Sequence, residues 1–194
     1  SSFDLINRHE LVRQQMGDTV AEKVYDFEKN EQPIEMRVVG DNLFYYNTNN
    51  QLCRLTTGKS YLINQLFAHP KVLCQPETRI TTMAIQPGKQ RILLGVQDYL
   101  LSISMQKGTV DTVPCMRDKY ITSFTQSLGG GHLLLSTLNH GVFIGSGDRM
   151  KPVAGTAREV FINSVATDKG SPQHLILLTN HELQVVGGDS LRAD

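Results

Sequence analysis

Residues 121–145 read ITSFTQSLGGGHLLLSTLNHGVFIG, which is three short apolar runs separated by a glycine-rich turn and an Asn-His-Gly turn. The same pattern occurs in residues 80–104 (ITTMAIQPGKQRILLGVQDYLLSIS) and 162–186 (INSVATDKGSPQHLILLTNHELQVV). The copies start at positions 80, 121 and 162, so they align without gaps at a period of 41 residues. A fixed period of this length is the sequence signature of a solenoid or a propeller.

The aligned positions are those that a β-sheet requires, because apolar residues coincide with one another and turn residues do too. The matching sets are Ile80, Ile121 and Ile162; Met83, Phe124 and Val165; Gly88, Gly129 and Gly170; Leu93, Leu134 and Leu175; Leu94, Leu135 and Ile176; Asp98, Asn139 and Asn180; and Ile103, Ile144 and Val185. A looser copy in residues 36–55 precedes them, as expected of an atypical terminal repeat.

Each copy predicts strands rather than helices. The second run is almost continuously apolar, which is typical of a short strand buried on both faces. The rest of each period has room for a fourth strand, at residues 109–113 and 150–153. We therefore predict an all-β fold of about four four-stranded antiparallel β-propeller blades, a fragment or partial propeller. The β-branched, Gly and Asn content disfavours an α-solenoid, and a β-sandwich would not require a strict period.

The first 32 residues differ from the repeats and form a separate predicted segment. Residues 3–15 carry Leu5, Ile6, Leu11 and Val12 at roughly helical spacing, which predicts a short helix. Residues 19–27 are predicted as a strand. The repeat domain is expected to span residues 33–194, with blades near 33–74, 75–115, 116–156 and 157–194.

Charge and composition disfavour several classes of partner, although a local charged patch stays open. Lys plus Arg and Asp plus Glu each number 19 in 194 residues, so the net charge is zero and neither nucleic acid nor an anionic membrane is expected to bind. The longest apolar stretches are broken by polar residues, so no membrane insertion is expected. The chain opens with Ser1-Ser2 and reads as a piece of something longer.

The cysteines Cys53, Cys74 and Cys115 are too scattered for a disulfide framework and show no metal-binding spacing. We interpret them as small buried hydrophobic residues, and their redox state stays open. No nucleophile elbow or paired carboxylates point to catalysis, so no catalytic, cofactor or metal site is predicted and the ligand-binding residues are unknown.

Other patterns have functional and structural interpretations. Thr57-Gly58-Lys59-Ser60 resembles a phosphate-binding loop, but Cys53 stands where such a loop needs its first glycine, which favours a plain hairpin turn. His132 and His140 recur about one period later as His174 and His181. They are either residues that line a groove or bind metal, or turn and strand-edge residues that were duplicated with the blade. Tyr45, Tyr46, Tyr61, Tyr99 and Tyr120 are candidate stacking surfaces for sugars, although most are expected to pack in the core.

The repeats resemble the two-component regulator propeller repeat over roughly residues 33–189. The best match is Ile121-Thr122-Ser123, then Gly129-Gly130-Gly131, then residues 135–144 (LSTLNHGVFI). The chain has no Trp, and Leu133 or Leu134 occupies the region where that family has one. Divergent repeats of this family and another propeller family with the same blade pattern both fit.

The resemblance implies a periplasmic sensor region of a membrane-bound hybrid histidine kinase, of the kind that gut Bacteroidetes use to detect glycan fragments. It implies an oligosaccharide ligand, no catalysis within the chain, and contacts with other propeller blades or a second copy of the chain. The binding loops are expected at one end of the blades, either near Gly88, Gly129 and Gly170 or near Asp98, Asn139 and Asn180. A propeller scaffold for protein partners and a propeller-based hydrolase or lyase are the alternatives.

Overall fold

A computed structural model describes residues 2–7, 9–17, 19–56, 69–126, 132–146, 149–157, 161–171 and 174–187. Within these ranges the chain forms β-strands, short 3-10 turns at Pro87–Lys89 (η2) and Pro114–Met116 (η3), and no α-helix. The predicted all-β fold of antiparallel propeller-type blades is confirmed. No helix of the described part is long and apolar enough to cross a membrane.

The chain divides into two compact units, Ser1–Glu77 and Thr78–Asp194. The first unit holds a three-stranded and a four-stranded antiparallel sheet, each in sequential order. The strands of the first sheet are β1 (Ser2–Asn7), β2 (Glu10–Gln15) and β3 (Glu22–Asp26), and those of the second are β4 (Pro33–Val39), β5 (Asn42–Asn47), β6 (Leu52–Thr56) and β7 (Lys71–Cys74).

The core of the first unit lies between its two sheets. Leu11 and Phe27 pack from the β1–β3 side against Leu43, Tyr45 and Leu55 from β5 and β6. The Phe27 and Tyr45 rings meet edge to face with their centroids 5.2 Å apart. Successive residues of a strand point to opposite faces, so the apolar alternation of β5 and β6 places one set of side chains in this core.

The predicted helix in residues 3–15 is wrong, because this segment forms the β1–β2 hairpin. Leu5 is opposite Val12 and Ile6 is opposite Leu11, so two apolar pairs are arranged symmetrically about the turn. Their sequence spacing fits both a helical face and a hairpin, and pairing with β3 decides for the hairpin. The strand predicted at residues 19–27 is confirmed as β3, and the first sheet is an addition to the four predicted ones.

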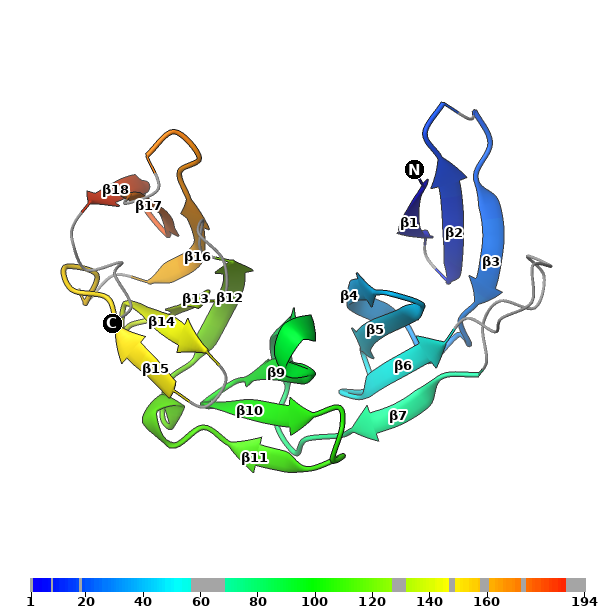
Figure 1. Ribbon diagram of the computed structural model, residues 1–194, viewed down its shortest axis with the longest axis horizontal. Helices are drawn as coiled ribbons and strands as arrows, with labels where there is room; N and C mark the ends of the chain where they lie inside the picture. Colours follow the sequence, from blue (N-terminus) through cyan, green and yellow to red (C-terminus); the bar gives the residue numbers. More distant parts are fainter. Residues whose placement is uncertain are drawn as a thin grey trace. The chain divides into compact units, whose positions relative to one another are not determined.

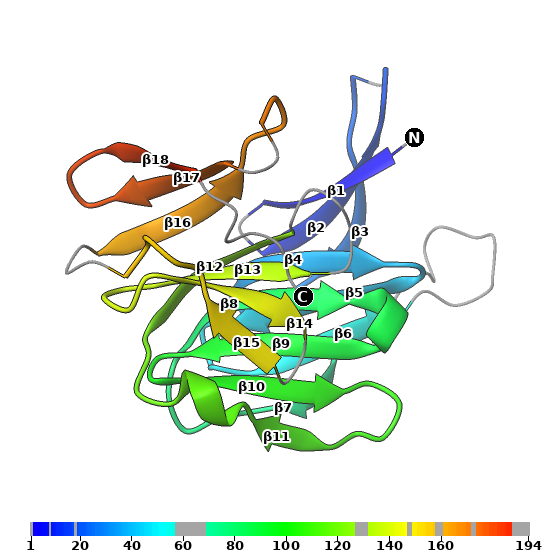
Figure 2. The same ribbon diagram turned by 60° about the vertical axis from the view of Figure 1, so that its left-hand side comes forward.

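The second unit holds three antiparallel sheets in sequential order. Their strands are β8 (Ile80–Gln86), β9 (Arg91–Val96), β10 (Tyr99–Ser104) and β11 (Val110–Thr112); β12 (Ile121–Gln126), β13 (Leu133–Thr137), β14 (Val142–Ser146) and β15 (Arg149–Pro152); and β16 (Ile162–Thr167), β17 (His174–Thr179) and β18 (Leu183–Gly187). The first strand of each sheet lies beside the first strand of the next, β8 beside β12 and β12 beside β16 (Figures 1 and 2).

Two apolar layers hold the three sheets of the second unit together. Leu93 and Leu100 of the β8–β11 sheet pack against Leu133, Leu135 and Phe143 of the β12–β15 sheet. The opposite face of the β12–β15 sheet presents Leu134, Val142 and Ile144 to Val165, Leu175 and Leu177 of the β16–β18 sheet. The middle sheet is therefore buried on both faces, which explains the unbroken run of leucines in β13.

The ungapped alignment of the repeats is wrong in the later strands. Ten residues separate Met83 from its partner Leu94, and ten separate Phe124 from Leu135, but eleven separate Val165 from Leu177. The structural counterpart of Leu134 is therefore Ile176, not Leu175. The third strand is shifted as well, because the β13–β14 turn has one residue more than the β9–β10 turn. Four residues lie between the paired residues Gly95 and Leu100, whereas five lie between the equivalent pair Ser136 and Val142. A one-residue shift moves a side chain to the other face of a sheet.

Each sheet except the first carries a β-bulge at the same place in its first strand. The register shifts between Pro33 and Glu35, Ile80 and Thr82, Ile121 and Ser123, and Ile162 and Ser164. The extra residue is Ile34, Thr81, Thr122 or Asn163. A bulge re-aims the side chain of its extra residue, which in the second unit brings threonine hydroxyls into contact with the next sheet.

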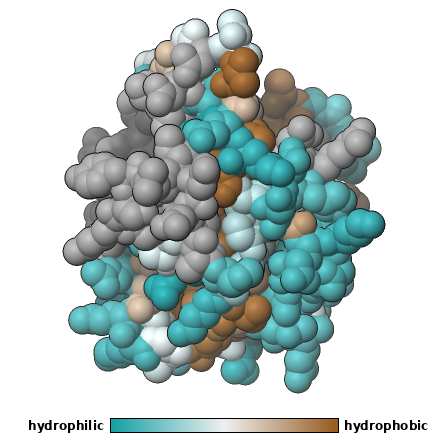
Figure 3. Space-filling model, turned by 90° about the vertical axis from the view of Figure 1, so that its right-hand side faces the viewer, coloured by the Kyte–Doolittle hydropathy of each residue, from teal (hydrophilic) through white to brown (hydrophobic). Residues whose placement is uncertain are grey.

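The surface of the chain is mixed in character. In the view of Figure 3, hydrophilic side chains cover much of the described surface, with smaller hydrophobic patches between them. This distribution is ordinary for a protein whose apolar residues are used mainly between sheets.

Candidate functional site

One end of the sheets in the second unit places polar and aromatic side chains at equivalent positions of each sheet, and most of them are exposed. We call it the Asn-His end, and its residues are Arg79, Gln97, Asp98, Tyr120, Asn139, His140, Phe161, Asn180 and His181. These residues either form the turn between the second and third strands or stand immediately before the first strand. The turn at Asp168 to Ser171 and the η2 turn lie at the opposite end.

The same backbone hydrogen bond closes each sheet at this end. The N–H of Gln97 donates to the carbonyl of Arg79 at 3.2 Å. Leu138 donates to Tyr120 at 2.9 Å, and Asn180 donates to Phe161 at 3.2 Å. Each second-to-third strand turn is thereby fixed to the residue that precedes the first strand of its own sheet.

Further backbone bonds join neighbouring sheets along this end. Lys119 N–H donates to the Asp98 carbonyl at 3.2 Å, and Ile162 N–H donates to the Leu138 carbonyl at 3.3 Å. The turns of all three sheets are therefore connected through one series of main-chain hydrogen bonds. The backbone of these turns therefore needs little ordering when a ligand binds, which favours affinity.

Threonine hydroxyls shape the two histidine-bearing turns. Thr137 Oγ1 accepts from the His140 N–H at 3.0 Å and donates to the Gly141 carbonyl at 2.7 Å. Thr179 Oγ1 accepts from the His181 N–H at 3.2 Å and donates to the Glu182 carbonyl at 2.9 Å. Each hydroxyl pairs with backbone N–H and carbonyl groups of its tight turn, as Ser and Thr side chains commonly do. The imidazoles of His140 and His181 take no part in these bonds and are exposed.

The exposed groups at the Asn-His end combine an aromatic ring with hydrogen-bonding side chains. Phe161 is 46% exposed and lies next to the turn of Asn180 and His181, through the bond between Asn180 and Phe161. Tyr120 holds the equivalent place one period earlier and is half-buried. Phe161 was not among the candidate residues predicted from the sequence, although its 41-residue spacing from Tyr120 was the available signal.

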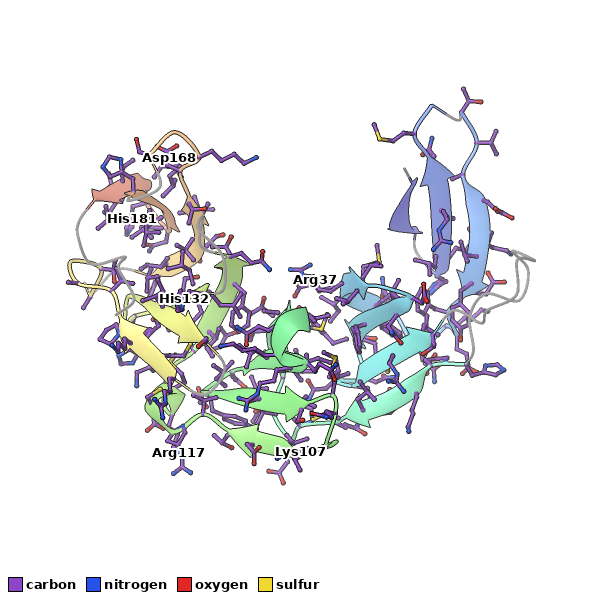
Figure 4. All side chains as sticks on the ribbon, viewed as in Figure 1. Arg37, Lys107, Arg117, His132, Asp168 and His181 are labelled. Atoms are coloured by element: carbon purple, nitrogen blue, oxygen red, sulfur yellow. The ribbon has the colours of Figure 1, made fainter. Side chains whose placement is uncertain are left out.

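The four histidines of the second unit fall into two pairs at opposite ends of the sheets. His140 and His181 belong to the Asn-His end, whereas His132 precedes β13 and His174 begins β17. Figure 4 labels His132 and His181, one residue of each pair. A Cβ at Gly187 would lie 2.6 Å from the His174 ring, so His174 is packed over that glycine. Among the residues that the structure describes, no three His, Cys, Asp or Glu side chains gather as metal ligands.

The tyrosines have unequal access to a ligand. Tyr45 is fully buried and Tyr46 is 3% exposed, so neither offers a free ring face. Tyr99 is half-buried, and its hydroxyl accepts a hydrogen bond from Thr78 at 3.1 Å. Tyr61 and Thr57-Gly58-Lys59-Ser60 lie outside the described residues, as does Gly129.

The cysteines also occupy different environments. Cys53 is fully buried in the core of the first unit, Cys74 is half-buried, and Cys115 is exposed. The interpretation of all three as buried residues is therefore wrong for Cys115, which lies in the η3 turn on the surface. Burial raises the pKa of the Cys53 thiol to about 11, and burial also raises the pKa of Cys74.

Comparison with known proteins identifies similar folds. No family model and no curated protein matches the sequence. Two structures of the extracellular domain of BT4673 from B. thetaiotaomicron, described once as a one-component and once as a hybrid two-component system, match 95% of the chain. Their identities are 15% and 14%, with TM-scores of 0.66 and 0.65. Chaetomium thermophilum Raptor matches 96% of the chain at 9% identity with a TM-score of 0.64.

These similarities are likenesses of fold. The chain spans only about a quarter of the BT4673 domains, 26% and 25%, and 18% of Raptor. Proteins of one fold carry unrelated functions, so the fold restricts the function of this chain without fixing it.

Proposed function

We propose that this chain is a non-catalytic sensor module from the extracytoplasmic, periplasmic part of a two-component signalling protein, and that it binds its ligand at the Asn-His end. The observation that carries the proposal is the match of 95% of the chain to two structures of the extracellular domain of BT4673, a one-component or hybrid two-component system. The resemblance of the repeats to the two-component regulator propeller repeat points in the same direction.

The ligand class that suits the Asn-His end is an oligosaccharide. Sugars offer hydroxyls to amide and imidazole groups and an apolar ring face to an aromatic side chain. Asn139, His140, Asn180 and His181 supply the first kind of group, and Phe161 supplies the second. The net charge of zero fits an uncharged ligand better than a polyanion.

Calorimetry against a panel of neutral oligosaccharides tests the ligand and the place where it binds. We expect one member to bind, and the double variant His140→Ala/His181→Ala to weaken that binding by at least about tenfold, which corresponds to about 1.4 kcal/mol. Phe161→Ala should weaken binding as well, because it removes a stacking surface. The melting temperature of each variant should stay unchanged, since all three side chains are exposed.

A matched control lies at the other end of the sheets. Lys169→Ala changes an exposed residue of the turn between β16 and β17 and should leave the affinity unchanged. Equal losses from Lys169→Ala and from the histidine variant would place the ligand elsewhere. A panel without any binding oligosaccharide would refute the proposed ligand class.

The cellular location has a separate test. Protease added to intact cells, and to cells with a permeabilised outer membrane, should cleave the chain only in the permeabilised cells if it is periplasmic. A cytoplasmic protein of the same strain is the control for lysis. Protection that persists until the inner membrane is broken would refute the extracytoplasmic location without bearing on ligand binding.

A further inference from the structure

The β16–β18 sheet has an apolar face that the described residues leave uncovered. Val165, Leu175 and Leu177 point into the layer shared with the β12–β15 sheet. The alternate residues lie on the opposite face, which we call the outer face of β16–β18. Its apolar residues are Ala166, Ile176, Leu178, Leu183 and Val185, and its polar residues are Ser164 and His174.

The exposure of this outer face is high for side chains of this kind. Leu183 is 68% exposed, Val185 is 67% exposed and Leu178 is 46% exposed. Leu183 is opposite Leu178, and Val185 is opposite Ile176, so the side chains form adjacent cross-strand pairs. A contiguous apolar patch on a sheet face marks an interaction site.

The equivalent faces of the two preceding sheets are interfaces. By strand pairing, Ile176 corresponds to Leu134, Leu183 to Val142 and Val185 to Ile144. Those three residues of the β12–β15 sheet are covered by the β16–β18 sheet. In the β8–β11 sheet, Leu93 corresponds to Leu134 and Leu100 corresponds to Val142. Both are covered by the β12–β15 sheet. The outer face of β16–β18 continues this series.

A polar contact between neighbouring sheets also repeats along the second unit. The bulge residue Thr81 donates its hydroxyl hydrogen to the Ile121 carbonyl at 2.7 Å, and the bulge residue Thr122 donates to the Ile162 carbonyl at 2.6 Å. Both acceptors are at the start of the first strand of the next sheet. Asn163 is the bulge residue of β16 and carries an amide N–H donor at this position.

We propose that the outer face of β16–β18 is the docking surface for a further β-blade of the same repeat type, supplied by polypeptide outside residues 1–194. Its first strand lies beside β16 and offers a backbone carbonyl to the Asn163 side chain. Its apolar residues cover Ile176, Leu178, Leu183 and Val185. Within the second unit, both an apolar layer and a hydrogen bond from a bulge residue join each sheet to the next, and this combination occurs twice.

The first sheet of a second copy is a poor occupant of this surface. The face of β1–β3 turned away from Leu11 carries Lys23, whose Nζ lies 3.2 Å from Asp26 and 3.8 Å from Glu10. Covering Leu183 and Val185 with that face would bury these charges, and the desolvation penalty of the charges opposes the gain from burying the two apolar side chains. An apolar blade face carries no such penalty.

Extension of the chain by one period tests the proposal. Ser146 and Gly187 end β14 and β18 and are one period apart, so residues 147–187 can be repeated after Gly187 in place of 188–194. This addition supplies a copy of the face formed by Val165, Leu175 and Leu177. Val185→Cys is introduced into both lengths of chain, and its labelling by a maleimide is compared with that of exposed Cys115 in the same molecule.

We expect the Val185→Cys thiol to react at a rate similar to that of Cys115 in the chain of 194 residues. In the extended chain its rate should fall at least about tenfold, while that of Cys115 stays constant. Leu183→Lys in the extended chain should restore the labelling, because it places a charge inside the new interface.

Unchanged labelling of Val185→Cys in the extended chain would overturn the proposal, whether the added blade stays unfolded or folds away from the surface. A dimer of the chain of 194 residues in which Val185→Cys is protected would identify a second copy as the occupant and would overturn it too. Neither result depends on ligand binding, so the proposed sensor function is tested separately.

Discussion

The hydroxyl of Thr122 donates a hydrogen bond to the carbonyl of Ile162 at 2.6 Å, across the boundary between two sheets. Thr122 is the extra residue of a bulge, and its hydroxyl also lies 2.7 Å from Ser136 Oγ. The same bond recurs one period earlier between Thr81 and Ile121. A side chain that would otherwise stay within its own sheet thus fixes the position of the next one.

Replacing this hydroxyl should lower stability measurably. Thr122→Val keeps the shape of the side chain but leaves the Ile162 carbonyl without that donor, and we expect a loss of about 1 to 3 kcal/mol in the free energy of unfolding. Urea denaturation followed by circular dichroism measures it. Thr112→Val makes the same chemical change at an exposed site on β11 and should alter stability by less than about 0.5 kcal/mol. Equal effects of the two substitutions would contradict the role of Thr122.

The register of β17 is open to an equally direct test. Leu175 is 1% exposed and packs against the β12–β15 sheet, whereas Leu178, on the opposite face, is 46% exposed. Leu175→Ala should cost about 2 to 5 kcal/mol, and Leu178→Ala should cost less than about 1 kcal/mol. Denaturation midpoints of the two variants give the comparison. A larger loss for Leu178→Ala would mean that β17 pairs one residue away from the register described above.

The period of 41 residues was sufficient to predict the blades, because stacked sheets repeat their apolar positions at the spacing of the whole unit. It could not predict register, since the single added residue before β17 leaves the apolar pattern of Leu175, Ile176 and Leu177 readable in either phase. The β1–β2 hairpin was missed because Leu5, Ile6, Leu11 and Val12 satisfy two periodicities at once.

The candidate site was only partly predictable. The repeated turns at Asn139 and Asn180 were visible in the sequence, but the repeat pattern does not distinguish between the two ends of the blades. Burial removes Tyr45 and Tyr46 from the candidate sugar-stacking surfaces and leaves Phe161 as an exposed ring. The inter-sheet role of Thr81 and Thr122 depends on a bulge, which a pattern of apolar and polar residues does not reveal.

Alkaline pH should destabilise the first unit through its buried core. Burial raises the pKa of Cys53 to about 11 from its ordinary value of 9.0, and burial also raises the pKa of its cross-strand neighbour Tyr45. Between pH 9 and pH 11 the unfolded thiol loses its proton while the folded thiol keeps it, so the unfolded state gains stability. The contribution of Cys53 is fully present below pH 9 and is lost as the pH rises through 11.

Chemical denaturation of the wild type and of Cys53→Ala at a series of pH values measures this effect. The free energy of unfolding of the wild type should fall between pH 9 and pH 11, and that of Cys53→Ala should fall less. The comparison uses the slope of each protein, because the alanine variant also loses packing. Parallel curves for the two proteins would show that Cys53 does not contribute to the alkaline transition.

The turn that carries His140 depends on a glycine, and the chain contains a matched control for it. Gly141 has a φ of +78°, and a Cβ there would lie 2.7 Å from the carbonyl oxygen of Thr156 and 2.8 Å from Thr156 Oγ1. That hydroxyl accepts a hydrogen bond from the Val142 N–H at 2.9 Å and donates to the Val153 carbonyl at 2.7 Å. An added methyl group therefore meets atoms that are held in place by other bonds.

Gly155 has nearly the same backbone conformation, with a φ of +77°, but a Cβ there would meet only Val186, at 3.9 Å. Both Gly→Ala substitutions carry the cost of a left-handed backbone, about 1 kcal/mol, and only Gly141→Ala adds a steric clash. We expect Gly141→Ala to lose at least about 1 kcal/mol more than Gly155→Ala in urea denaturation. If the turn at His140 binds the ligand, Gly141→Ala should also weaken binding while Gly155→Ala does not. Equal stability of the two variants would show that the turn can relax away from Thr156, and His140 would then lack the fixed position on which recognition at the Asn-His end depends.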